Sequence, residues 1–93
     1  MTYRIKFTNA YKKSYKRAKK RGLNLHRLDD VVDALRKGRK LDAKHRDHEL
    51  HGNWAGFREC HIQPDWLLIY LVENDILTLT LVETGTHADR FDE

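Results

Sequence analysis

FRECHIQPDWLLIYLVENDILTLTLVET, residues 57–84, decides the fold of this chain. The stretch holds three runs of strand-forming residues, 57–63, 66–72 and 76–84, divided by Pro-Asp and by Glu-Asn-Asp. Runs of β-branched and aromatic residues bounded by turn formers are typical of strands. The middle run, WLLIYLV, is continuously apolar, which predicts a central strand covered on both faces. Because the turns are short, the three strands should form an antiparallel meander.

The last run also predicts which side chains share a face. Leu77, Leu79 and Leu81 alternate with Thr78 and Thr80. Because successive side chains of a strand point to opposite faces, we expect the three leucines to lie on one face and the two threonines on the other.

The first 38 residues predict one strand and two helices. YRIKF, residues 3–7, alternates like a strand, and Thr8 or Asn9 can then cap a helix through its side-chain oxygen. Tyr11, Tyr15 and Ala18 recur at helical spacing before Gly22, which predicts the end of that helix. A second helix is expected after a cap at Asn24 and before Gly38, with an apolar stripe made of Leu25, Leu28, Val31, Val32 and Leu35.

Together these elements predict a single α+β domain over residues 1–93, in the order β-α-α-β-β-β. The two N-terminal helices should pack on one face of an antiparallel sheet, since both must bury an apolar stripe. Residues 39–56 have no sustained periodicity and contain two glycines, so we interpret them as a connection. A connection of that length in a small domain is often functional.

Composition narrows the class of protein. The single cysteine, Cys60, excludes an intramolecular disulfide and a zinc site of several cysteines, which favours a reducing, cytoplasmic setting. The charged N-terminal residues do not resemble a signal peptide. The longest apolar run covers only residues 66–72, far short of a membrane span, so no membrane partner is expected.

The charges are distributed unevenly along the chain. Residues 1–46 hold 16 basic and 4 acidic side chains, whereas residues 47–93 hold 2 basic and 10 acidic ones. Such asymmetry indicates a polyanionic partner for one surface, and nucleic acid is the leading candidate. The alternative is a solvated helix that is simply rich in lysine.

Histidines suggest two kinds of chemistry. His45, His48 and His51 lie three residues apart, a spacing that can gather imidazoles on one side of a helix. The segment runs into HGNWAG, however, which is a poor support for rigid ligands, and no zinc-protease pattern is present. We therefore expect no metal site.

Acid–base catalysis fits the topology better. In the predicted meander, the end of 57–63, the start of 66–72 and the end of 76–84 share one edge, which brings His61, Asp65 and His87 toward one rim. Imidazole is suited to proton transfer near neutral pH, both from a ribose 2′-hydroxyl and to a 5′-oxygen. A surface or capping role for each histidine, and a turn role for Asp65, are the alternatives.

Four ordered pieces carry a resemblance to a known family: DHEL at 47–50, GNWAGFR at 52–58, HIQPDW at 61–66 and TGTHADRF at 84–91. With them the chain resembles the YafQ branch of the RelE/ParE toxin superfamily, from its first strand to residue 91. The resemblance implies a toxin that cuts mRNA in the ribosomal A site, with no metal or organic cofactor. It also implies a co-expressed antitoxin, of the DinJ/RelB type, that wraps the toxin.

By motif position, the resemblance implies an acid–base set and substrate contacts. His48, His61, Asp65 and His87 are the acid–base set, with His87 the general acid and the base among the other three. Phe91 would contact the mRNA, and the lysine-rich first helix would meet ribosomal RNA.

The chain departs from the family at one important position. Glu83 stands where YafQ relatives commonly have an arginine that steadies the scissile phosphate. The candidates to supply that positive charge instead are Arg58, Lys44, Arg46 and Arg90.

Two other functions remain open from the sequence. One is a ParE-like toxin of the same fold that inhibits gyrase by binding, although such a binder has no need of clustered histidines. The other is a nucleic-acid-binding module without catalysis, whose binding would be sensitive to salt and indifferent to the histidines.

Overall fold

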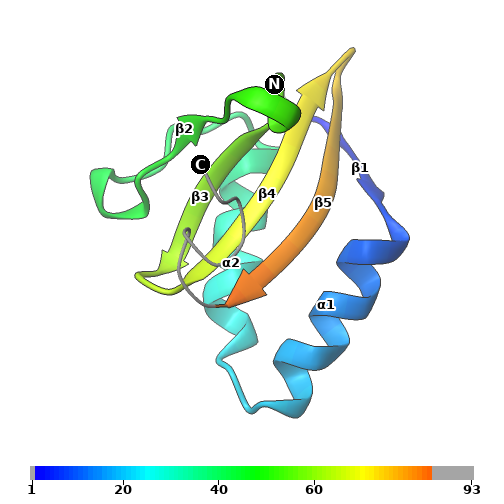
Figure 1. Cartoon of the computed structure of the whole chain (residues 1–93). Coiled ribbons are helices and arrows are strands. Elements are labelled where there is room, and N and C mark those ends of the chain that lie inside the picture. Colours follow the sequence, from blue (N-terminus) through cyan, green and yellow to red (C-terminus); the bar gives the residue numbers. More distant parts are fainter. Residues whose placement is uncertain (1, 85–93) are drawn as a thin grey trace.

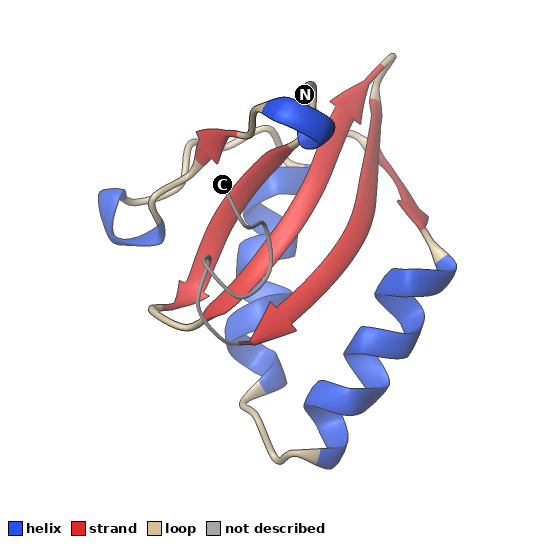
Figure 2. Ribbon diagram, viewed as in Figure 1, coloured by secondary structure: helices blue, strands red, loops and turns tan. Residues whose placement is uncertain are grey.

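Strand β4 (Trp66–Glu73) lies at the centre of a five-stranded sheet, with β3 (Arg58–Gln63) and β5 (Ile76–Thr84) antiparallel on either side. The computed structural model describes residues 2–84. Figure 1 and Figure 2 show both helices on the same side of this sheet. The predicted meander and the predicted layer of helices are thus confirmed.

The hairpin between β4 and β5 is closed by Asn74 and Asp75. Their φ angles are 52° and 64°, so both lie in the left-handed region. A two-residue loop with both φ values positive has the type I′ twist that suits antiparallel strands, and Asn and Asp tolerate that conformation. The predicted turn at 73–75 follows from these residue types.

Strand β1 (Arg4–Phe7) corrects one part of the predicted sheet. It pairs with β5 in parallel, with Arg4 opposite Ile76 and Phe7 opposite Leu79, so the sheet is mixed rather than wholly antiparallel. Parallel neighbours need a long connection between them, and here the two helices and three intervening strands supply it. The full strand order is β1-β5-β4-β3-β2.

Both helices begin and end where capping residues allow. Helix α1 (Asn9–Lys20) is capped by Thr8, whose hydroxyl accepts the Tyr11 backbone N–H at 3.0 Å. Asn24 caps α2 (Leu25–Arg36) in the same way, accepting the N–H of His26 at 3.1 Å. Gly22, with φ of 75°, ends the first helix in a left-handed conformation.

The helices bury their apolar stripes against one face of the sheet. The core on this helix face contains Leu28, Val31 and Leu35 of α2 and Trp66, Leu68 and Tyr70 of β4. Leu67 and Ile69 alternate with the β4 core residues and are also buried, at 1 % and 0 % exposure. The prediction that β4 is covered on both faces is therefore confirmed over its first five residues.

A β-bulge in β5 overturns the predicted face of one leucine. Ile69 pairs with Leu81 but Tyr70 pairs with Leu79, which leaves Thr80 as the extra residue. Leu77, Leu79 and Val82 consequently belong to the helix-face core, and Leu81 does not. The bulge has a partner outside the sheet, because the Thr8 hydroxyl donates to the Thr80 carbonyl at 2.6 Å.

The segment predicted as a connection contains short structured pieces. It holds the 3-10 turns η1 (Ala43–His45) and η2 (Gly52–Trp54) and the two-residue strand β2 (His48–Glu49), which adds to the edge of the sheet at β3. Within residues 2–84 no helix has the length and apolar character needed to span a membrane.

Candidate active site

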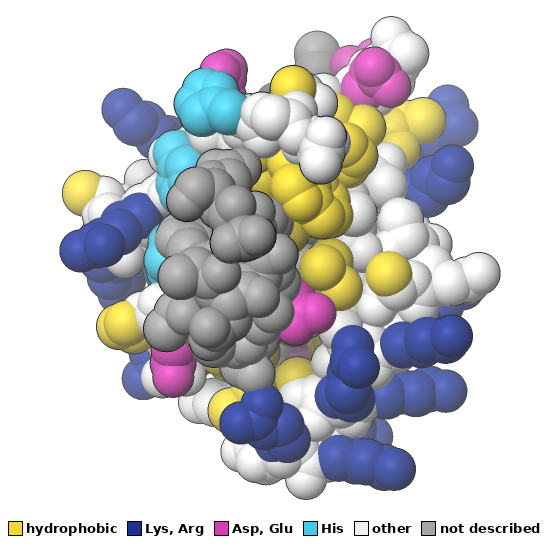
Figure 3. Space-filling view, viewed as in Figure 1, with side chains coloured by type: hydrophobic (Ala, Val, Ile, Leu, Met, Phe, Trp, Pro, Cys, Tyr) yellow, Lys and Arg dark blue, Asp and Glu magenta, His cyan; other side chains and the backbone are white. Residues whose placement is uncertain are grey.

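The sheet face opposite the helices carries two histidines around a carboxylate. Cys60 and Ile62 of β3 lie in the helix-face core, so Glu59 and His61, which alternate with them, point to the other face. Strand pairing then places His48 of β2 directly opposite Glu59. We call this surface the histidine face. Figure 3 shows histidine side chains gathered on the side of it where β2 and β3 lie.

Glu59 is the buried centre of this group. Its side chain is 0 % exposed, while those of His48 and His61 are 45 % and 10 % exposed. The Nε2 atom of His48 lies 3.3 Å from Glu59 Oε1, and that of His61 lies 3.7 Å from the same oxygen. The two imidazole rings are 6.4 Å apart between centroids. Because a buried carboxylate is costly without compensating partners, the two histidines contribute to stabilising this position.

Backbone carbonyls determine how both rings are oriented. His48 Nδ1 lies 2.6 Å from the Arg46 carbonyl, and His61 Nδ1 lies 3.1 Å from the Pro64 carbonyl. A carbonyl oxygen only accepts, so each Nδ1 must carry a hydrogen and donate it. The Nε2 atoms, turned toward Glu59, are therefore the atoms at which each ring gains or loses a proton.

This arrangement requires a proton between His48 and Glu59. A neutral ring with its hydrogen on Nδ1 presents a lone pair at Nε2, and a carboxylate also presents lone pairs. Two acceptors do not bond at 3.3 Å, so either the imidazole or the carboxyl group holds a proton there. The three side chains, His48, Glu59 and His61, form an acid–base cluster.

Turns at both ends of the cluster explain its local shape. Arg46 has φ of 46°, a left-handed conformation that is uncommon for a residue with a side chain. It turns the chain so that its own carbonyl meets the His48 ring. On β3, pairing shifts register between His61 and Gln63, and the Pro64 carbonyl of the following turn reaches back to the His61 ring.

Asp47 anchors the short strand β2 from the helix side. Its Oδ1 accepts the Tyr70 hydroxyl at 2.6 Å and the Arg58 Nε–H at 3.2 Å. Burial, and next the hydrogen bond to Asp47, raise the pKa of the Tyr70 phenol, so this bond persists at alkaline pH. Neighbouring residues of an extended segment point to opposite faces of the sheet. Because the Asp47 side chain is bound on the helix side, the His48 side chain points to the histidine face.

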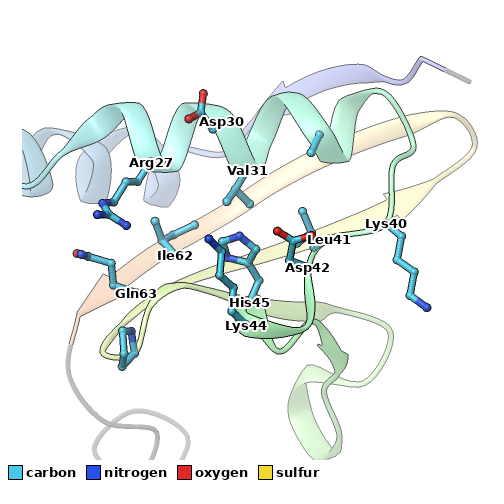
Figure 4. Close-up of a pocket in the computed structure, with 12 residues that line it drawn as sticks. Arg27, Asp30, Val31, Lys40, Leu41, Asp42, Lys44, His45, Ile62 and Gln63 are labelled. Carbon is cyan, nitrogen blue, oxygen red and sulfur yellow. The ribbon is translucent and has the colours of Figure 1, made fainter.

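The basic side chains that are predicted to bind the substrate do not all lie beside the histidines. Arg58 alternates with Glu59, and its guanidinium pairs with Asp47 and, at 3.7 Å, with Glu49. Lys44 lines a cavity of about 520 Å³ between α2 and the η1–β3 region, shown in Figure 4 with Arg27 and Gln63. Arg46 is exposed beside His48. Of the three, Arg46 contacts the cluster through its backbone carbonyl, whereas Arg58, although it directly precedes Glu59, points to the opposite face.

The same cavity touches the cluster through one further histidine. His45 lines it (Figure 4). The Nδ1 atom of His45 lies 2.7 Å from the backbone carbonyl of His61. His45 thus supports the strand that carries His61. No group of three or more His, Cys, Asp or Glu side chains within residues 2–84 could hold a metal ion.

Of the remaining predicted site residues, some lie near the shared edge of the sheet and others lie outside the described residues. Asp65 is exposed in the β3–β4 turn, and Trp66 beside it pairs with Thr84, so this turn and the end of β5 do share one edge. His87, Phe91 and Arg90 lie outside the described residues. Glu83 pairs with Leu67, which pairs with His61, so Glu83 belongs to the histidine face.

Sequence reasoning missed Glu59 and Asp47. Glu59 stands two residues before His61 in an alternating strand, a signal that both share a face. Asp47 belongs to the DHEL piece, but its structural role gives no signal in the sequence, because its partners Tyr70 and Arg58 are distant along the chain.

Comparison with known proteins identifies the family of the chain. Residues 3–92 match the family of the bacterial toxin of type II toxin-antitoxin systems, YafQ. The mRNA interferase toxin YafQ of Escherichia coli K12 is 36 % identical over 88 residues, which cover 94 % of each chain.

Solved structures extend the likeness to three dimensions. The E. coli YafQ toxin in its complex with DinJ superposes with a TM-score of 0.86 at 33 % identity, covering 98 % of this chain and 99 % of that one. A copper-bound mutant toxin from Helicobacter pylori superposes with a TM-score of 0.89 at 34 % identity, covering 97 % and 100 %. Since the family match covers almost the whole sequence, the chain belongs to the YafQ family of type II toxin-antitoxin toxins.

Proposed function

We propose that the chain is an mRNA interferase: an endoribonuclease toxin that cleaves mRNA in the ribosomal A site and is neutralised by a cognate antitoxin. The carrying observation is the His48–Glu59–His61 cluster, a buried carboxylate between two imidazoles on the sheet face away from the helices. The relatives named mRNA interferase and the DinJ–YafQ complex support the same function. The setting is the bacterial cytoplasm.

The chemistry needs two proton transfers. The ribose 2′-oxygen attacks the adjacent phosphorus, and its proton passes to an imidazole Nε2 of the cluster. The P–O5′ bond breaks, the 5′-oxygen takes a proton from His87, and the products are a 2′,3′-cyclic phosphate and a 5′-hydroxyl. All bonds and protons balance without a metal or organic cofactor.

Other predicted residues have supporting roles in this proposal. Asp65, exposed at the same edge, is available to orient the substrate or to share the proton. Phe91 stacks on the mRNA. Arg46, Arg58 and Lys44 supply positive charge around the phosphate backbone. The basic α1 helix, which contains no acidic residue, faces ribosomal RNA; Figure 3 shows lysine and arginine side chains gathered over it.

The test is cleavage of a defined mRNA on bacterial ribosomes with an open A site. The purified chain is compared with His48→Gln, His61→Gln and His87→Ala variants, and with free mRNA. The exposed His51→Gln variant is the matched control. We expect cuts at the A-site codon only on ribosomes, lost in the three variants and retained in the control.

Two further arms separate the alternatives. Cleavage should survive when transition metals are stripped from the toxin by a chelator and only Mg²⁺ for the ribosome is returned. Intact mRNA together with broken DNA in poisoned cells would assign the chain to gyrase instead. Salt-sensitive RNA binding without cleavage would leave a binding module.

A further inference from the structure

A hydrogen-bond network on the helix side of the sheet ends at the residue before His48. The Tyr70 hydroxyl donates to Asp47 Oδ1 at 2.6 Å, and the Arg58 Nε–H donates to the same oxygen at 3.2 Å. We call these three side chains the Asp47 anchor. Because the anchor lies on the helix side, its link to the acid–base cluster runs through the backbone between Asp47 and His48.

The strand that carries His48 has little support of its own. Strand β2 consists of His48 and Glu49, and both of their side chains are exposed. Their partners on β3 are Glu59 and Arg58. Strands of this length are marginal unless other contacts hold them. The place of His48 opposite Glu59 therefore depends on contacts outside the strand itself.

The Asp47 anchor supplies such a contact by crossing the sheet. Figure 1 shows β3 between β2 and β4. Tyr70 of β4 lies opposite Arg58 of β3, which lies opposite Glu49 of β2. The bond from Tyr70 to Asp47 thus ties the beginning of the edge strand to the central strand, past the strand between them. Tyr70 is only 2 % exposed, so its ring is a fixed point for this bond.

We propose that Tyr70, acting through Asp47, is a positioning residue for His48 in the cleavage reaction. The anchor holds Asp47 on the helix side, which keeps His48 Nε2 at 3.3 Å from Glu59. Without the anchor, β2 separates from β3 more often, and His48 leaves the acid–base cluster each time. The inference rests on the proposed function, in which an imidazole of the cluster takes the ribose proton.

The first test measures single-turnover cleavage of mRNA on ribosomes as the toxin concentration is varied. Tyr70→Phe keeps the ring and removes the hydroxyl. We expect the maximal rate to fall about tenfold or more, as for the loss of a hydrogen bond to a charged acceptor, with an unchanged half-saturating concentration. Tyr11→Phe makes the same change at a buried tyrosine of α1 and is the matched control, which should keep the wild-type rate.

A rescue test uses the single oxygen of Asp47 at which both bonds end. The amide oxygen of an asparagine accepts hydrogen bonds as the carboxylate oxygen does. Asp47→Asn should therefore keep most of the rate that Asp47→Ala loses. Asp42→Ala is the control, because Asp42 is an exposed aspartate of the same connection whose side chain caps no backbone N–H of η1.

A double-mutant cycle separates positioning of His48 from a general structural role. Tyr70→Phe is combined with His48→Gln, and the residual cleavage of the double variant is compared with that of His48→Gln alone. If Tyr70 acts through His48, the second substitution has no further effect. A general loss of structure would lower the residual rate as well.

Amide hydrogen exchange of the purified chain tests the anchor without any cleavage. The Leu50 N–H, directly after β2, donates to the Phe57 carbonyl at 2.9 Å. Opening of β2 exposes this amide, so we expect its exchange to be about tenfold faster in Tyr70→Phe and unchanged in Tyr11→Phe. Circular dichroism confirms that each variant is folded at the temperature of the assay.

Several outcomes would overturn the inference and leave the toxin assignment intact. These are an unchanged maximal rate in Tyr70→Phe, an equal loss in Tyr11→Phe, a further loss in the His48→Gln background, and unchanged exchange at Leu50. A higher half-saturating concentration at an unchanged rate would assign Tyr70 to substrate binding instead. If the wild-type chain leaves ribosomal mRNA intact, the proposed function itself fails, and this inference fails with it.

Discussion

At the residue scale, the acid–base cluster depends on the buried side chain of Glu59. Glu59 is fully buried, whereas His48 is nearly half exposed. Replacing Glu59 by glutamine removes the charge and keeps the shape of the side chain. This substitution therefore separates the electrostatic role of the carboxylate from its packing.

Glu59→Gln is therefore predicted to reduce cleavage on ribosomes by about 100-fold or more, within the range typical of lost acid–base catalysis. The amide can donate to a histidine but cannot exchange the shared proton. Glu49→Gln, one residue from His48 and mostly exposed, is the matched control and should stay near wild type. The measurement is the single-turnover rate against pH. An unchanged rate and pH profile for Glu59→Gln would remove the carboxylate from the chemistry.

The histidines of this site could be predicted, but their connection could not. His48 and His61 follow from residue type, spacing and the strand pattern. The link between them requires knowing that residues 48–49 pair with β3, and a two-residue strand carries too little pattern to reveal this. Orientation by the carbonyls of Arg46 and Pro64 depends on local backbone angles that sequence does not specify.

At the element scale, helix α1 is tied to the sheet by its own capping residue. The Thr8 hydroxyl accepts the Tyr11 N–H and donates to the Thr80 carbonyl at the β5 bulge. One side chain thus starts the helix and fixes it to the strand on which it packs.

Thr8→Ala should lower the free energy of unfolding by about 1–2 kcal/mol, since it loses the cap and the hydrogen bond to the bulge. Asn9→Ala is the control, because Asn9 is the other cap candidate in the sequence and lies inside the helix. Its effect should be within about 0.5 kcal/mol, as is usual for surface substitutions. Urea unfolding measures both values. A larger loss in Asn9→Ala than in Thr8→Ala would contradict this assignment of the cap.

Most element positions followed from periodicity, and the exceptions have a common cause. Strands 57–63, 66–72 and 76–84, and both caps, were predicted within a residue or two. The face of Leu81 and the parallel pairing of β1 were not, because both depend on how one strand meets another. Pattern within a strand determines alternation, whereas a bulge or an edge pairing is decided between strands.

At the scale of the whole molecule, three buried acids make stability fall at alkaline pH. Burial raises the pKa of Tyr11, Cys60 and Tyr70. The unfolded chain releases these protons at about pH 8.5 for cysteine and about pH 10 for tyrosine, while the folded chain retains them. Since the unfolded state then binds fewer protons, the free energy of unfolding decreases as pH rises.

Each such group is predicted to contribute a slope of up to about 1.4 kcal/mol per pH unit above its unfolded value. Urea unfolding at several pH values between 8 and 11 gives the slope. Tyr70→Phe should reduce the slope above about pH 10 by one group, although it also loses the bond to Asp47. A slope unchanged by Tyr70→Phe would show that the Tyr70 phenol ionises alike in both states.

Net charge also separates two sides of the molecule. All the charged side chains of helix α1 are basic. On the histidine face, the acidic Glu83 pairs with Leu67, which in turn pairs with His61, so these three residues form one row across the sheet. Adjacent strands are about 4.8 Å apart, so Glu83 and His61 are roughly 10 Å apart across the row. A carboxylate at that distance opposes the approach of a phosphate backbone.

Glu83→Arg should therefore raise the rate of mRNA cleavage on ribosomes, by about tenfold if one charge-assisted contact to phosphate is gained. The matched control is Glu73→Arg, which makes the same change of charge at an exposed residue at the far end of β4. Rates are compared at two salt concentrations, because a direct phosphate contact makes the rate more sensitive to salt. Equal acceleration in both variants would indicate net charge alone. A slower Glu83→Arg enzyme would mean that the Glu83 carboxylate itself takes part in the reaction of this chain.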